Sequence, residues 1–591
     1  MSKPKLALIP SGYKSGKVYS ILPNDASGDF DFTRQSIGTR VRKDGLIEEA
    51  KTVGSITNEL LYSEEFTQSF WLKTNSTITA NDTLAPNGTN TADKIIPNTS
   101  NSIHQIKTNV EYNSSIYTYS IYAKKDFYKN ILVWFDGLGG GLGVNLDDSS
   151  IFRNENIQEH RVDALANGWY RISITANITT NSRPSIYVYD NSATPQISFA
   201  GNGVNGLFIW GAMLSEGALS DYIKTEGTTE TKTVETFTDV PRLDWYNSNC
   251  PSLLLEPQRL NSIIQSQDLN TSWSVFNGGS ISSNEIIAPN GELEADELIT
   301  NGTGFSFVKP TTNPTISTGN NTFTIFAKKS TSDELWLRLD YGTTIYNRKF
   351  NLSTQTISTG FDNTANIPNE ESIENYGNGW YRLRITDTAD TTSFEPRIYI
   401  ADATSNNGDS VYLFGAQVEQ GSYPTSYIKT EASAVTRLKD ECYGGGTADL
   451  FNDNEGVLFL NMKAFVNGGT NRFIQIHDGS YNNAIGLFFT ATTNRIVARV
   501  YASGSFAFDL NYTVDDVTQY HKYAFKYKSA DYQLWVDGTK VLTNSLTTTP
   551  TGLNQIGFLQ GLSGNDFFGK VKDLRYFDNG LTDTELTELT K

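Results

Sequence analysis

Cysteine, histidine and methionine are scarce in this chain of 591 residues, which has 2 Cys, 4 His and 3 Met. So few thiols and imidazoles leave little material for a metal centre, a catalytic nucleophile or a disulfide framework. Cys250 and Cys442 fall in different predicted modules, so we expect free thiols. The motifs G-x-S-x-G, H-E-x-x-H and G-x-x-x-x-G-K-[ST] are also missing, which removes the common sequence signals for hydrolases, zinc proteases and nucleotide binding.

Positive charge and long apolar runs are limited as well. Lys and Arg number 47 against 65 Asp and Glu, and the formal net charge of −18 disfavours contact with nucleic acid phosphates. The longest apolar run near the N-terminus is LALI, too short for a signal-peptide core, and no run is long enough to span a membrane. We expect a protein made in a cytoplasm without a signal peptide, with no nucleic-acid partner and no membrane insertion.

Aromatic and small residues are plentiful. Aromatics make up 12% of the chain and charged residues only 19%, with 48 Gly and long runs of Thr, Ser and Asn. This balance is typical of all-β modules of the extracellular or virion type. The length exceeds what one ordinary core fills, so three or four domains are predicted.

A long internal repeat organises the first two thirds of the chain. Residues 58–231 align with residues 261–436, and seven markers recur in the same order. Each copy consists of short runs with period two, bounded by Asn, Gly, Pro and Ser, which predicts a jelly-roll β-sandwich of roughly 170 residues. The clearest pairs are LAPNGTNTADKI with IAPNGELEADEL, YSIYAKK with FTIFAKK, NGWYR with NGWYR, and SDYIKTE with TSYIKTE.

The phrase NGWYR opens a strand with alternating residues in both copies. Since successive strand residues point to opposite faces, at most one of Trp and Tyr enters the same core. We predict that Trp169 and Trp380 are structural anchors, each beside an Asn-Gly turn. These turns are Asn167-Gly168 and Asn378-Gly379.

Two segments outside the repeat resemble a family of bacteriophage tail-fibre and related virion proteins. In that family a segment F-x-R-x-S-x-x-T-R-V-x-x-D-G-L-I usually runs almost directly into V-P-R-L-D-Y-x-x-x-x-C-P-S-L-L-L-E-P-x-R-x-N and then a jelly roll. The chain departs at Trp245, where Tyr is usual, and in carrying an extra module between the two halves. The matching positions are Phe32, Arg34, Ser36, Thr39, Arg40, Val41, Asp44, Gly45, Val240–Asp244, Cys250–Pro257, Arg259 and Asn261.

This resemblance covers residues 1 to about 436 and implies that residues 1–57 and 232–260 come together, with the first module inserted between them. It also implies attachment to other phage tail proteins through the N-terminal segment, and a homo-oligomer such as a trimer. The predicted domains are an N-terminal virion-attachment segment (1–57), a first jelly roll (58–231), a connector (232–260), a second jelly roll (261–437) and a C-terminal module (438–591).

The C-terminal module has a different series of strands. Phrases such as YQLWVDGTKV and GKVKDLRYFDNGLTDTELTEL resemble a laminin-G or concanavalin-like lectin sandwich. Many such modules bind glycans, and some bind Ca²⁺ through loop oxygens. No cofactor is expected apart from a structural Ca²⁺, for which the weak candidates are Asp478, Asp537 and Asp566.

Aromatic rings suit the C–H faces of sugars, so aromatic residues near loops, or with neighbours that differ between the copies, are glycan-binding candidates. The alternative at each position is ordinary packing. The candidates are Trp134 and Trp336 in the jelly rolls and Tyr443, Tyr481 and Tyr501 in the last module.

Three functions remain open after these observations. The preferred one is a non-enzymatic tail-fibre or tail-associated virion protein that binds host surface polysaccharide for adsorption. A virion-associated polysaccharide depolymerase and an architectural tail or capsid decoration protein without a receptor are the alternatives. The glycines of GLGGGLG at Gly137–Gly143 are followed by no helix that could bind phosphate, so we interpret them as a flexible loop between strands.

Overall fold

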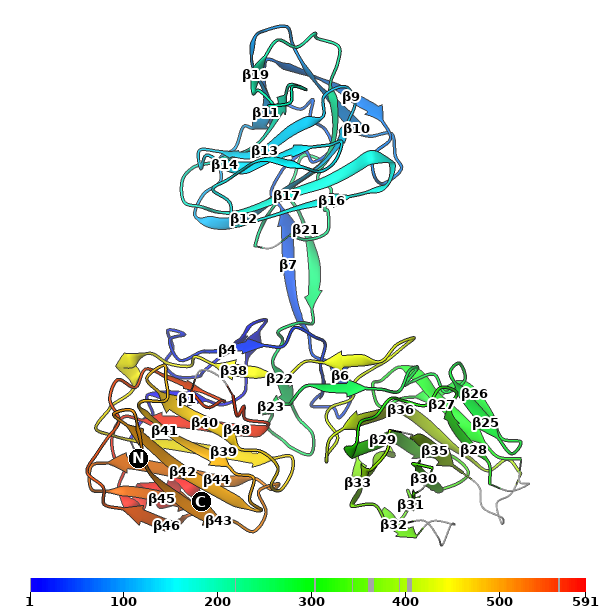
Figure 1. Ribbon diagram of the computed structural model, residues 1–591, viewed down its shortest axis with the longest axis vertical. Coiled ribbons are helices and arrows are strands. Elements are labelled where there is room, and N and C mark those ends of the chain that lie inside the picture. The colour runs from blue at the N-terminus through cyan, green and yellow to red at the C-terminus, as the bar shows by residue number, and fades with distance from the viewer. Residues whose placement is uncertain are drawn as a thin grey trace. The chain divides into compact units, whose positions relative to one another are not determined.

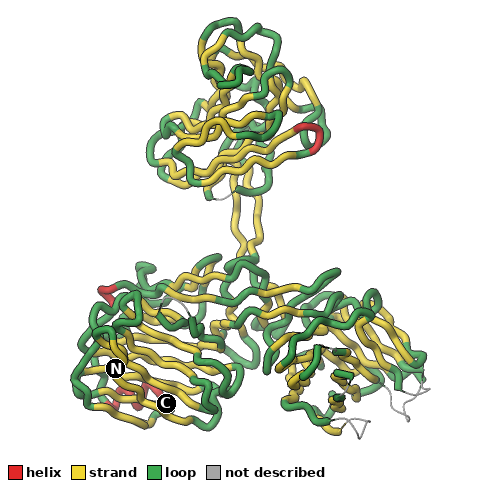
Figure 2. The backbone as a smooth tube through the Cα atoms, viewed as in Figure 1, coloured by secondary structure: helices red, strands yellow, loops and turns green. Residues whose placement is uncertain are grey.

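The computed structural model describes residues 2–217, 219–301, 305–342, 344–359, 366–392, 394–400, 407–561 and 564–591. Strands dominate the described chain, and helix is confined to α1 (Asp583–Thr590) and short 3-10 turns (Figure 2). The multi-domain, all-β fold class is therefore confirmed. The chain forms two compact units, one of residues 53–235 and one of residues 1–52 with 236–591 (Figure 1).

The inserted unit is a sandwich of two antiparallel sheets. Its strands are β7 (Thr52–Asn58), β8 (Trp71–Thr74), β9 (Ser76–Thr83), β10 (Ala92–Pro97), β11 (Ser102–Thr108), β12 (Ser115–Lys125), β13 (Asn130–Asp136), β14 (Gly140–Asn145), β15 (Ile151–Glu155), β16 (Glu159–Ala164), β17 (Trp169–Ile178), β18 (Arg183–Tyr189), β19 (Ser198–Phe199), β20 (Leu207–Glu216) and β21 (Glu230–Thr236). One sheet has the order β16-β17-β12-β20-β10-β9, and the other runs β15-β14-β13-β18-β11-β19 with β8 also on β11. The entering and leaving strands, β7 and β21, pair with each other.

The second jelly roll repeats this topology, except that β19 has no counterpart among its described strands. Its strands are β24 (Arg259–Asn261), β25 (Trp273–Phe276), β26 (Ser280–Ile287), β27 (Leu293–Ile299), β28 (Phe307–Pro310), β29 (Gly319–Lys329), β30 (Glu334–Asp340), β31 (Ile345–Asn351), β32 (Thr356–Thr359), β33 (Glu370–Asn375), β34 (Trp380–Ala389), β35 (Glu395–Tyr399), β36 (Ser410–Gln420) and β37 (Val435–Arg437). Its sheets have the orders β33-β34-β29-β36-β27-β26 and β32-β31-β30-β35-β28-β25, while β24 pairs with β37.

A glycine produces the same irregularity in both copies. The register between β12 and β20 shifts after Ser120, and the register between β29 and β36 shifts after Thr324. Gly211 and Gly415 lie at these shifts with φ of 61° and 65°, a conformation that other residues adopt only with strain. A Cβ on Gly211 would also lie 2.9 Å from the Tyr122 ring. The repeated W/F-G-A phrase thus records a shared β-bulge.

The C-terminal sandwich draws strands from three parts of the sequence. Its own elements are β38 (Glu441–Tyr443), β39 (Glu455–Ala464), β40 (Arg472–His477), β41 (Ala484–Phe489), β42 (Arg495–Ala502), β43 (Ser505–Thr513), β44 (His521–Lys528), β45 (Tyr532–Val536), β46 (Thr539–Asn544), β47 (Gln555–Gly557), β48 (Gly569–Phe577) and α1. The N-terminal segment adds β1 (Leu6–Leu8), β2 (Tyr13–Lys14), β3 (Lys17–Val18) and β4 (Phe30–Thr33), and the connector adds β22 (Arg242–Asp244) and β23 (Ser252–Leu255). The remaining strands of the N-terminal segment, β5 (Thr39–Val41) and β6 (Ile47–Glu49), pair with each other in a separate small sheet.

The added strands β1–β4, β22 and β23 belong to the sheets and the core of the sandwich. One sheet has the order β22-β23-β48-β39-β44-β45-β46 with β1 also on β48, the second runs β43-β42-β41-β40-β47, and β38 extends the small sheet β2-β3-β4. Leu8, Phe32 and Leu253 are buried in the same core as the residues of β39–β48. Residues 438–591 therefore share one hydrophobic core with the N-terminal segment and the connector.

Both jelly rolls bury one carboxylate at an equivalent position. Asp93 in β10 accepts hydrogen bonds from the backbone N–H groups of Phe66 and Asn81, at 3.0 and 2.9 Å. Asp296 in β27 accepts the corresponding bonds from Leu269 and Asn284, at 2.8 and 3.0 Å. Burial outweighs these bonds and raises the pKa of Asp93 to about 6.

This raised pKa predicts a pH dependence of the inserted unit. Between the ordinary pKa of 3.8 and the folded pKa of about 6, the folded state holds a proton that the unfolded state has lost. The free energy of unfolding of a fragment spanning residues 53–235 should therefore decrease, by on the order of 3 kcal/mol, as the pH rises through this window. Denaturant unfolding between pH 4 and 7 measures it. Asp93→Asn should flatten the dependence, and an unchanged slope in that variant would assign the effect to other groups.

Candidate ligand-binding surfaces and the junction pocket

The two predicted jelly-roll tryptophans occupy equivalent strands. Trp134 in β13 and Trp336 in β30 lie on the sheet face that points away from the main core, because their neighbours Val133 and Leu335 belong to that core. Trp134 is 9% exposed and Trp336 is 3% exposed. Each ring carries a cation on its face, so neither presents an open platform. These cations are the Arg153 guanidinium, 4.4 Å from the Trp134 ring centroid, and the Lys349 ammonium, 5.8 Å from that of Trp336.

The glycine-rich stretch beside Trp134 is half turn and half strand. Residues 137–139 form the turn between β13 and β14, as the loop interpretation predicts, but the loop interpretation is wrong for Gly140–Gly143. Gly140–Asn145 is β14, paired with β13 on one side and β15 on the other. A Cβ on Gly141 would lie 2.7 Å from the Trp134 ring, and one on Gly143 would lie 2.6 Å from the Phe152 ring. The glycines are required because the aromatic rings on this face lie directly against the backbone.

The two predicted anchors lie in matching environments. Trp169 and Trp380 are each 2% exposed, and each begins a strand directly after its Asn-Gly turn. Both residues of each turn have positive φ. The angles are 61° at Asn167, 77° at Gly168, 51° at Asn378 and 79° at Gly379. The indole N–H groups donate to the carbonyl oxygens of Leu84 and Ile287, at 3.2 and 3.1 Å.

Two of the three tyrosine candidates lie near each other on the C-terminal sandwich. Tyr501 lies on β42, and its ring contacts Phe506 edge-on, with centroids 6.0 Å apart. The turn between them, Ser503–Gly504, donates two hydrogen bonds to the loop that carries Tyr481. The Gly504 N–H donates to Asn482 O and the Ser503 N–H donates to Asn483 Oδ1. Tyr481 and Phe506 are 46% and 54% exposed.

Arg499 joins these rings into one surface. Its guanidinium lies 4.8 Å from the centroid of Phe488, 5.9 Å from Tyr501 and 5.5 Å from Phe506. Asp509 accepts hydrogen bonds from Arg499 Nε and Nη2, at 2.8 and 2.7 Å, and so fixes the guanidinium plane. We call Arg499, Tyr501 and Phe506, together with Tyr481 on the adjacent loop, the aromatic surface. Sequence reasoning missed Arg499 and Phe506, although the alternation R-x-Y in β42 places Arg499 and Tyr501 on one face.

The third candidate, Tyr443, belongs to another sheet. It lies on β38, opposite Asp31 of β4, and is 38% exposed. Burial of part of the ring raises the pKa of its hydroxyl, and Asp31 contributes in the same direction.

The three calcium candidates are engaged by protein donors. Asp478 accepts from Ser480 and Asn483, Asp537 accepts from His521 Nδ1 and the Lys522 N–H, and Asp566 pairs with Lys439 at 2.8 Å. Within the described ranges, no group of three or more His, Cys, Asp or Glu side chains could hold a metal ion. Cys250 is an exposed free thiol and Cys442 a buried one.

A buried ionic cluster connects the segments that carry the tail-fibre resemblance. It consists of three guanidiniums and two carboxylates, from Arg34, Arg242, Arg437, Glu256 and Asp440. The side chains are at most 4% exposed. Asp440 pairs with both Arg34 and Arg242, while Glu256 pairs with both Arg242 and Arg437. The N-terminal segment, the connector and the chain after the second jelly roll therefore meet at one charged centre.

The cluster distorts the ionisation of its members. Burial lowers the pKa of Arg34 to about 10, against the opposing effect of Asp440. Burial acts to raise the pKa of Glu256, but Arg437 and Arg242 hold it well below its usual range. Sequence reasoning did not assign these residues to a cluster, although Arg34, Arg242 and Glu256 are motif positions in separate segments and Arg437 ends the predicted second jelly roll.

Beside this cluster lies a cavity of about 270 Å³, which we call the junction pocket. It is lined by β5, the connector, the second jelly roll and the start and end of the C-terminal sandwich. Its volume is close to the lower end of the roughly 300–1,000 Å³ typical of small-molecule sites.

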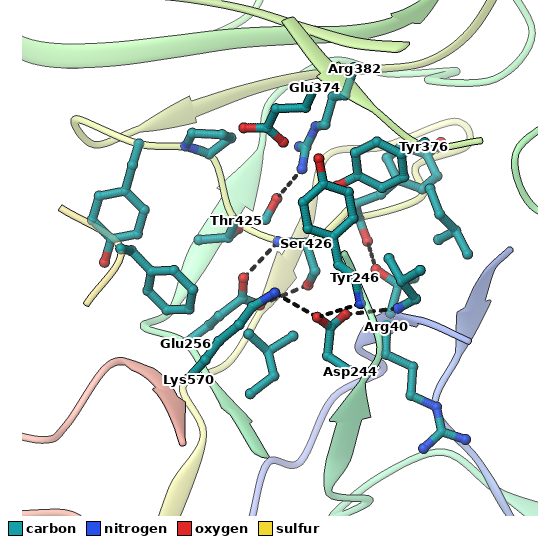
Figure 3. A pocket seen from close by; sticks show the side chains of 18 of the residues that line it. Arg40, Asp244, Tyr246, Glu256, Glu374, Tyr376, Arg382, Thr425, Ser426 and Lys570 are labelled. Atoms are coloured by element: carbon teal, nitrogen blue, oxygen red, sulfur yellow. Dashed lines mark hydrogen bonds and ion pairs between the residues drawn. The ribbon is translucent and has the colours of Figure 1, made fainter. Parts of the chain in front are cut away.

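Figure 3 shows the arrangement of its side chains. The rings of Tyr246 and Tyr376 lie side by side with centroids 4.7 Å apart. Lys570 points to Asp244 and donates to its Oδ2 at 2.5 Å, while the other carboxylate oxygen accepts from the Val41 N–H at 3.0 Å. Aromatic walls with polar groups at fixed positions can bind a small hydroxylated molecule.

No helix in the part of the chain that the structure describes has the length and apolar character to cross a membrane.

Comparisons with known proteins identify one segment of the chain. No curated protein sequence matches this chain. Among solved structures, the chain is similar to the Ruminococcus gnavus IT-sialidase CBM40 bound to alpha2,3 sialyllactose, with 16% identity, 25% of this chain and 94% of that chain covered, and a TM-score of 0.22. It is similar to the CBM22-1-CBM22-2 tandem domain of Paenibacillus barcinonensis Xyn10C, with 10% identity, 62% and 98% coverage and a TM-score of 0.21. It is also similar to mouse laminin alpha1 domains LG4-5, with 10% identity, 56% and 92% coverage and a TM-score of 0.18. Residues 459–587, which contain most of the C-terminal sandwich and the whole aromatic surface, match the family model of the Concanavalin A-like lectin/glucanases superfamily.

Proposed function

We propose that this protein is a structural component of a bacteriophage tail that binds a glycan on the host cell surface through its C-terminal sandwich. The observation that carries this proposal is the aromatic surface, where two exposed rings and a fixed guanidinium lie within the segment that matches a lectin superfamily. Aromatic rings contact the C–H faces of a sugar, and the guanidinium can donate to its oxygens. The tail location is supported by the motif resemblance of residues 1 to about 436.

In this proposal the modules have different roles. The N-terminal segment contacts other tail proteins, and the C-terminal sandwich, whose core includes strands of the N-terminal segment, carries the glycan-binding surface. Several copies in one particle, as in a trimeric fibre, raise the effective concentration of weak sites, so that adsorption is strong although each site is weak. The protein reaches the cell exterior as part of the virion.

Two alternative functions are each supported by one observation. The first alternative is a polysaccharide depolymerase, because the matching superfamily includes glucanases. An architectural protein without a receptor is the second alternative, because most of the predicted aromatic candidates are packed against neighbouring side chains.

Point variants test the proposal better than truncation, because a chain ending near Arg437 would lose most of a core that it shares with the N-terminal segment. In the full-length protein, Tyr481→Ala and Phe506→Ala should each weaken retention on host cells or on the host polysaccharide by about three- to tenfold, the value of one aromatic contact. Phe127→Ala, at a ring 51% exposed in the inserted unit, is the matched control and should bind normally.

Reducing ends released during the same incubation separate the alternatives. Release of sugar by the wild-type protein would favour the depolymerase. Failure of the wild-type protein to bind any member of a panel that includes the true host would favour the architectural protein.

A further inference from the structure

We propose that the junction pocket binds a sugar unit that carries a carboxylate, of the uronic-acid class. This inference rests on the proposed function and adds a second, chemically defined glycan site, located away from the aromatic surface. It follows from the unused hydrogen-bonding groups, the charges and the ring faces that line the cavity.

The second jelly roll contributes buried N–H donors without acceptors. Arg382 is 4% exposed, and its terminal nitrogens donate to Thr425 O at 2.8 Å and to Thr324 Oγ1 at 3.0 Å. Its Nε and the Nε of Arg384 are buried and have no hydrogen-bond partner among the described residues. Arg384 is paired only at 3.4 Å, with Glu370, whose side chain is 61% exposed. Since an unmatched buried donor costs about 1–3 kcal/mol, a ligand oxygen that accepts from these groups would be stabilised.

The C-terminal sandwich contributes an ammonium group without a carboxylate. Within the part of the chain that the structure describes, Lys463 of β39 has no Asp or Glu oxygen within 4 Å, and its charged end lies 5.4 Å from the Tyr520 ring centroid. Burial lowers the pKa of Lys463 and neighbouring Lys570 lowers it further, while the more distant carboxylates of Glu374 and Asp244 act in the opposite direction without reversing the shift. A ligand carboxylate would supply the missing counter-charge.

Glu374 selects for hydroxyl groups on the same ligand. It lies on β33, and its one hydrogen-bonding contact within the described residues is the Ser372 hydroxyl at 3.5 Å. A carboxylate oxygen accepts hydrogen bonds from sugar hydroxyls but repels a second anion. A plain inorganic anion is therefore a poor fit, whereas a hydroxylated acid can direct hydroxyls to Glu374 and its carboxylate to the cations.

Ring faces and net charge complete the fit. The Tyr246–Tyr376 pair and the stacked pair Tyr423–Phe465, with the latter centroids 5.5 Å apart, form apolar walls for the C–H groups of a sugar ring. A cation lies 5.4 Å from one ring centroid in each pair, Lys570 at Tyr246 and Arg259 at Tyr423, so ring edges as well as faces line the cavity.

Among the described residues that line the pocket, Lys570 pairs with Asp244, Arg40 with Glu48 outside the lining, and Glu256 with Arg242 and Arg437. The remaining charged side chains of the lining are the cations Arg382, Arg384 and Lys463 and the anion Glu374, although the whole chain has a net charge of −18. The pocket is thus a local exception that favours an anion.

Ligand-observed NMR with the full-length protein tests the inference, using glucuronate against glucose and galacturonate against galactose, because each pair differs only in the carboxylate. We expect saturable binding of at least one acid, about tenfold tighter than its neutral partner, and weakening by added salt. Lys463→Gln and Arg384→Gln should each weaken the acid by about tenfold, Lys463→Arg should retain most of the binding, and Lys14→Gln, at an exposed lysine, should change nothing.

Other results would overturn the inference. These are no saturable binding of either acid, equal binding of acid and neutral sugar, inorganic phosphate binding as tightly as the acid, or loss of binding only in variants whose thermal unfolding temperature has also dropped. Retention on host cells through Tyr481 and Phe506 is measured in the same variants. If that retention persists while both acids fail to bind, the proposed function stands and the pocket assignment falls.

Discussion

Glu256→Gln is expected to destabilise the unit of residues 1–52 and 236–591 by about 3–5 kcal/mol, the typical cost of leaving a buried charge unpaired. The Glu256 carboxylate accepts from Arg242 and Arg437 and also from the Ser426 N–H, at 2.7 Å. Glutamine keeps the shape but replaces one acceptor oxygen with an NH₂ donor. Two guanidiniums would then face a neutral group that donates toward them.

Thermal unfolding of the full-length protein measures the effect. The transition of this unit should move to lower temperature or disappear, while that of residues 53–235 stays, because the inserted unit has its own core. Glu441→Gln is the control, since Glu441 pairs with Lys439 near the surface, with a side chain 37% exposed, where an ion pair contributes at most about 1 kcal/mol. Similar small losses in both variants would mean that the ionic cluster does not hold the segments together.

The pH dependence of this stabilisation has a definite sign. The folded pKa of Glu256 lies below the ordinary value of 4.5 because Arg437 and Arg242 outweigh its burial. A depressed acid stabilises the fold above its unfolded pKa and loses this contribution as the pH falls toward the folded value. The ionic cluster should therefore stabilise the unit fully at neutral pH and weaken only in acid, opposite to the effect of Asp93.

The repeated architecture was predictable because its signals are local. Period-two runs and Asn-Gly turns specify strands and hairpins without reference to distant residues, and both jelly rolls form with the same strand order. The short helix α1 was predictable for the same reason, since Thr582 caps it and Glu585 returns the bond to complete a capping box.

The shared core could not be derived from the same signals. Strands β1, β22 and β23 have three or four residues each, too few to show a period. Strand β48, which pairs with β1 and β23, lies more than 300 residues further along the chain than either. The low strand propensity of glycine favours a loop at the glycines of β14. They form a strand, however, because the neighbouring rings leave no room for a Cβ. Lys463 and Glu374 carry no sequence signal, since the cavity arises only when separate modules meet.

The same anchor tryptophan has an additional role in the second copy. Trp169 packs with Ala85, Ala92 and Trp210, whereas the Trp380 cluster also contains Val41 and Ile47 of the N-terminal segment. The turn A-P-N-G explains the difference. In the second copy, Pro289 O accepts from the Ile47 N–H at 2.9 Å and Gly291 lies against Leu46, but the equivalent Gly88 of the first copy has open space around the position of a Cβ.

Both Trp→Ala substitutions should cost about 3–5 kcal/mol, because each removes a buried ring and an indole hydrogen bond. Trp169→Ala should shift only the transition of residues 53–235, and Trp380→Ala only that of the other unit. Trp380→Ala should in addition raise amide hydrogen exchange at Thr39–Val41, since the lost ring supports the cluster that holds β5. Equal losses with unchanged exchange at β5 would mean that the tryptophan serves its own module alone. Faster exchange at β5 would mean that, in the second copy, the duplicated anchor also holds one wall of the junction pocket.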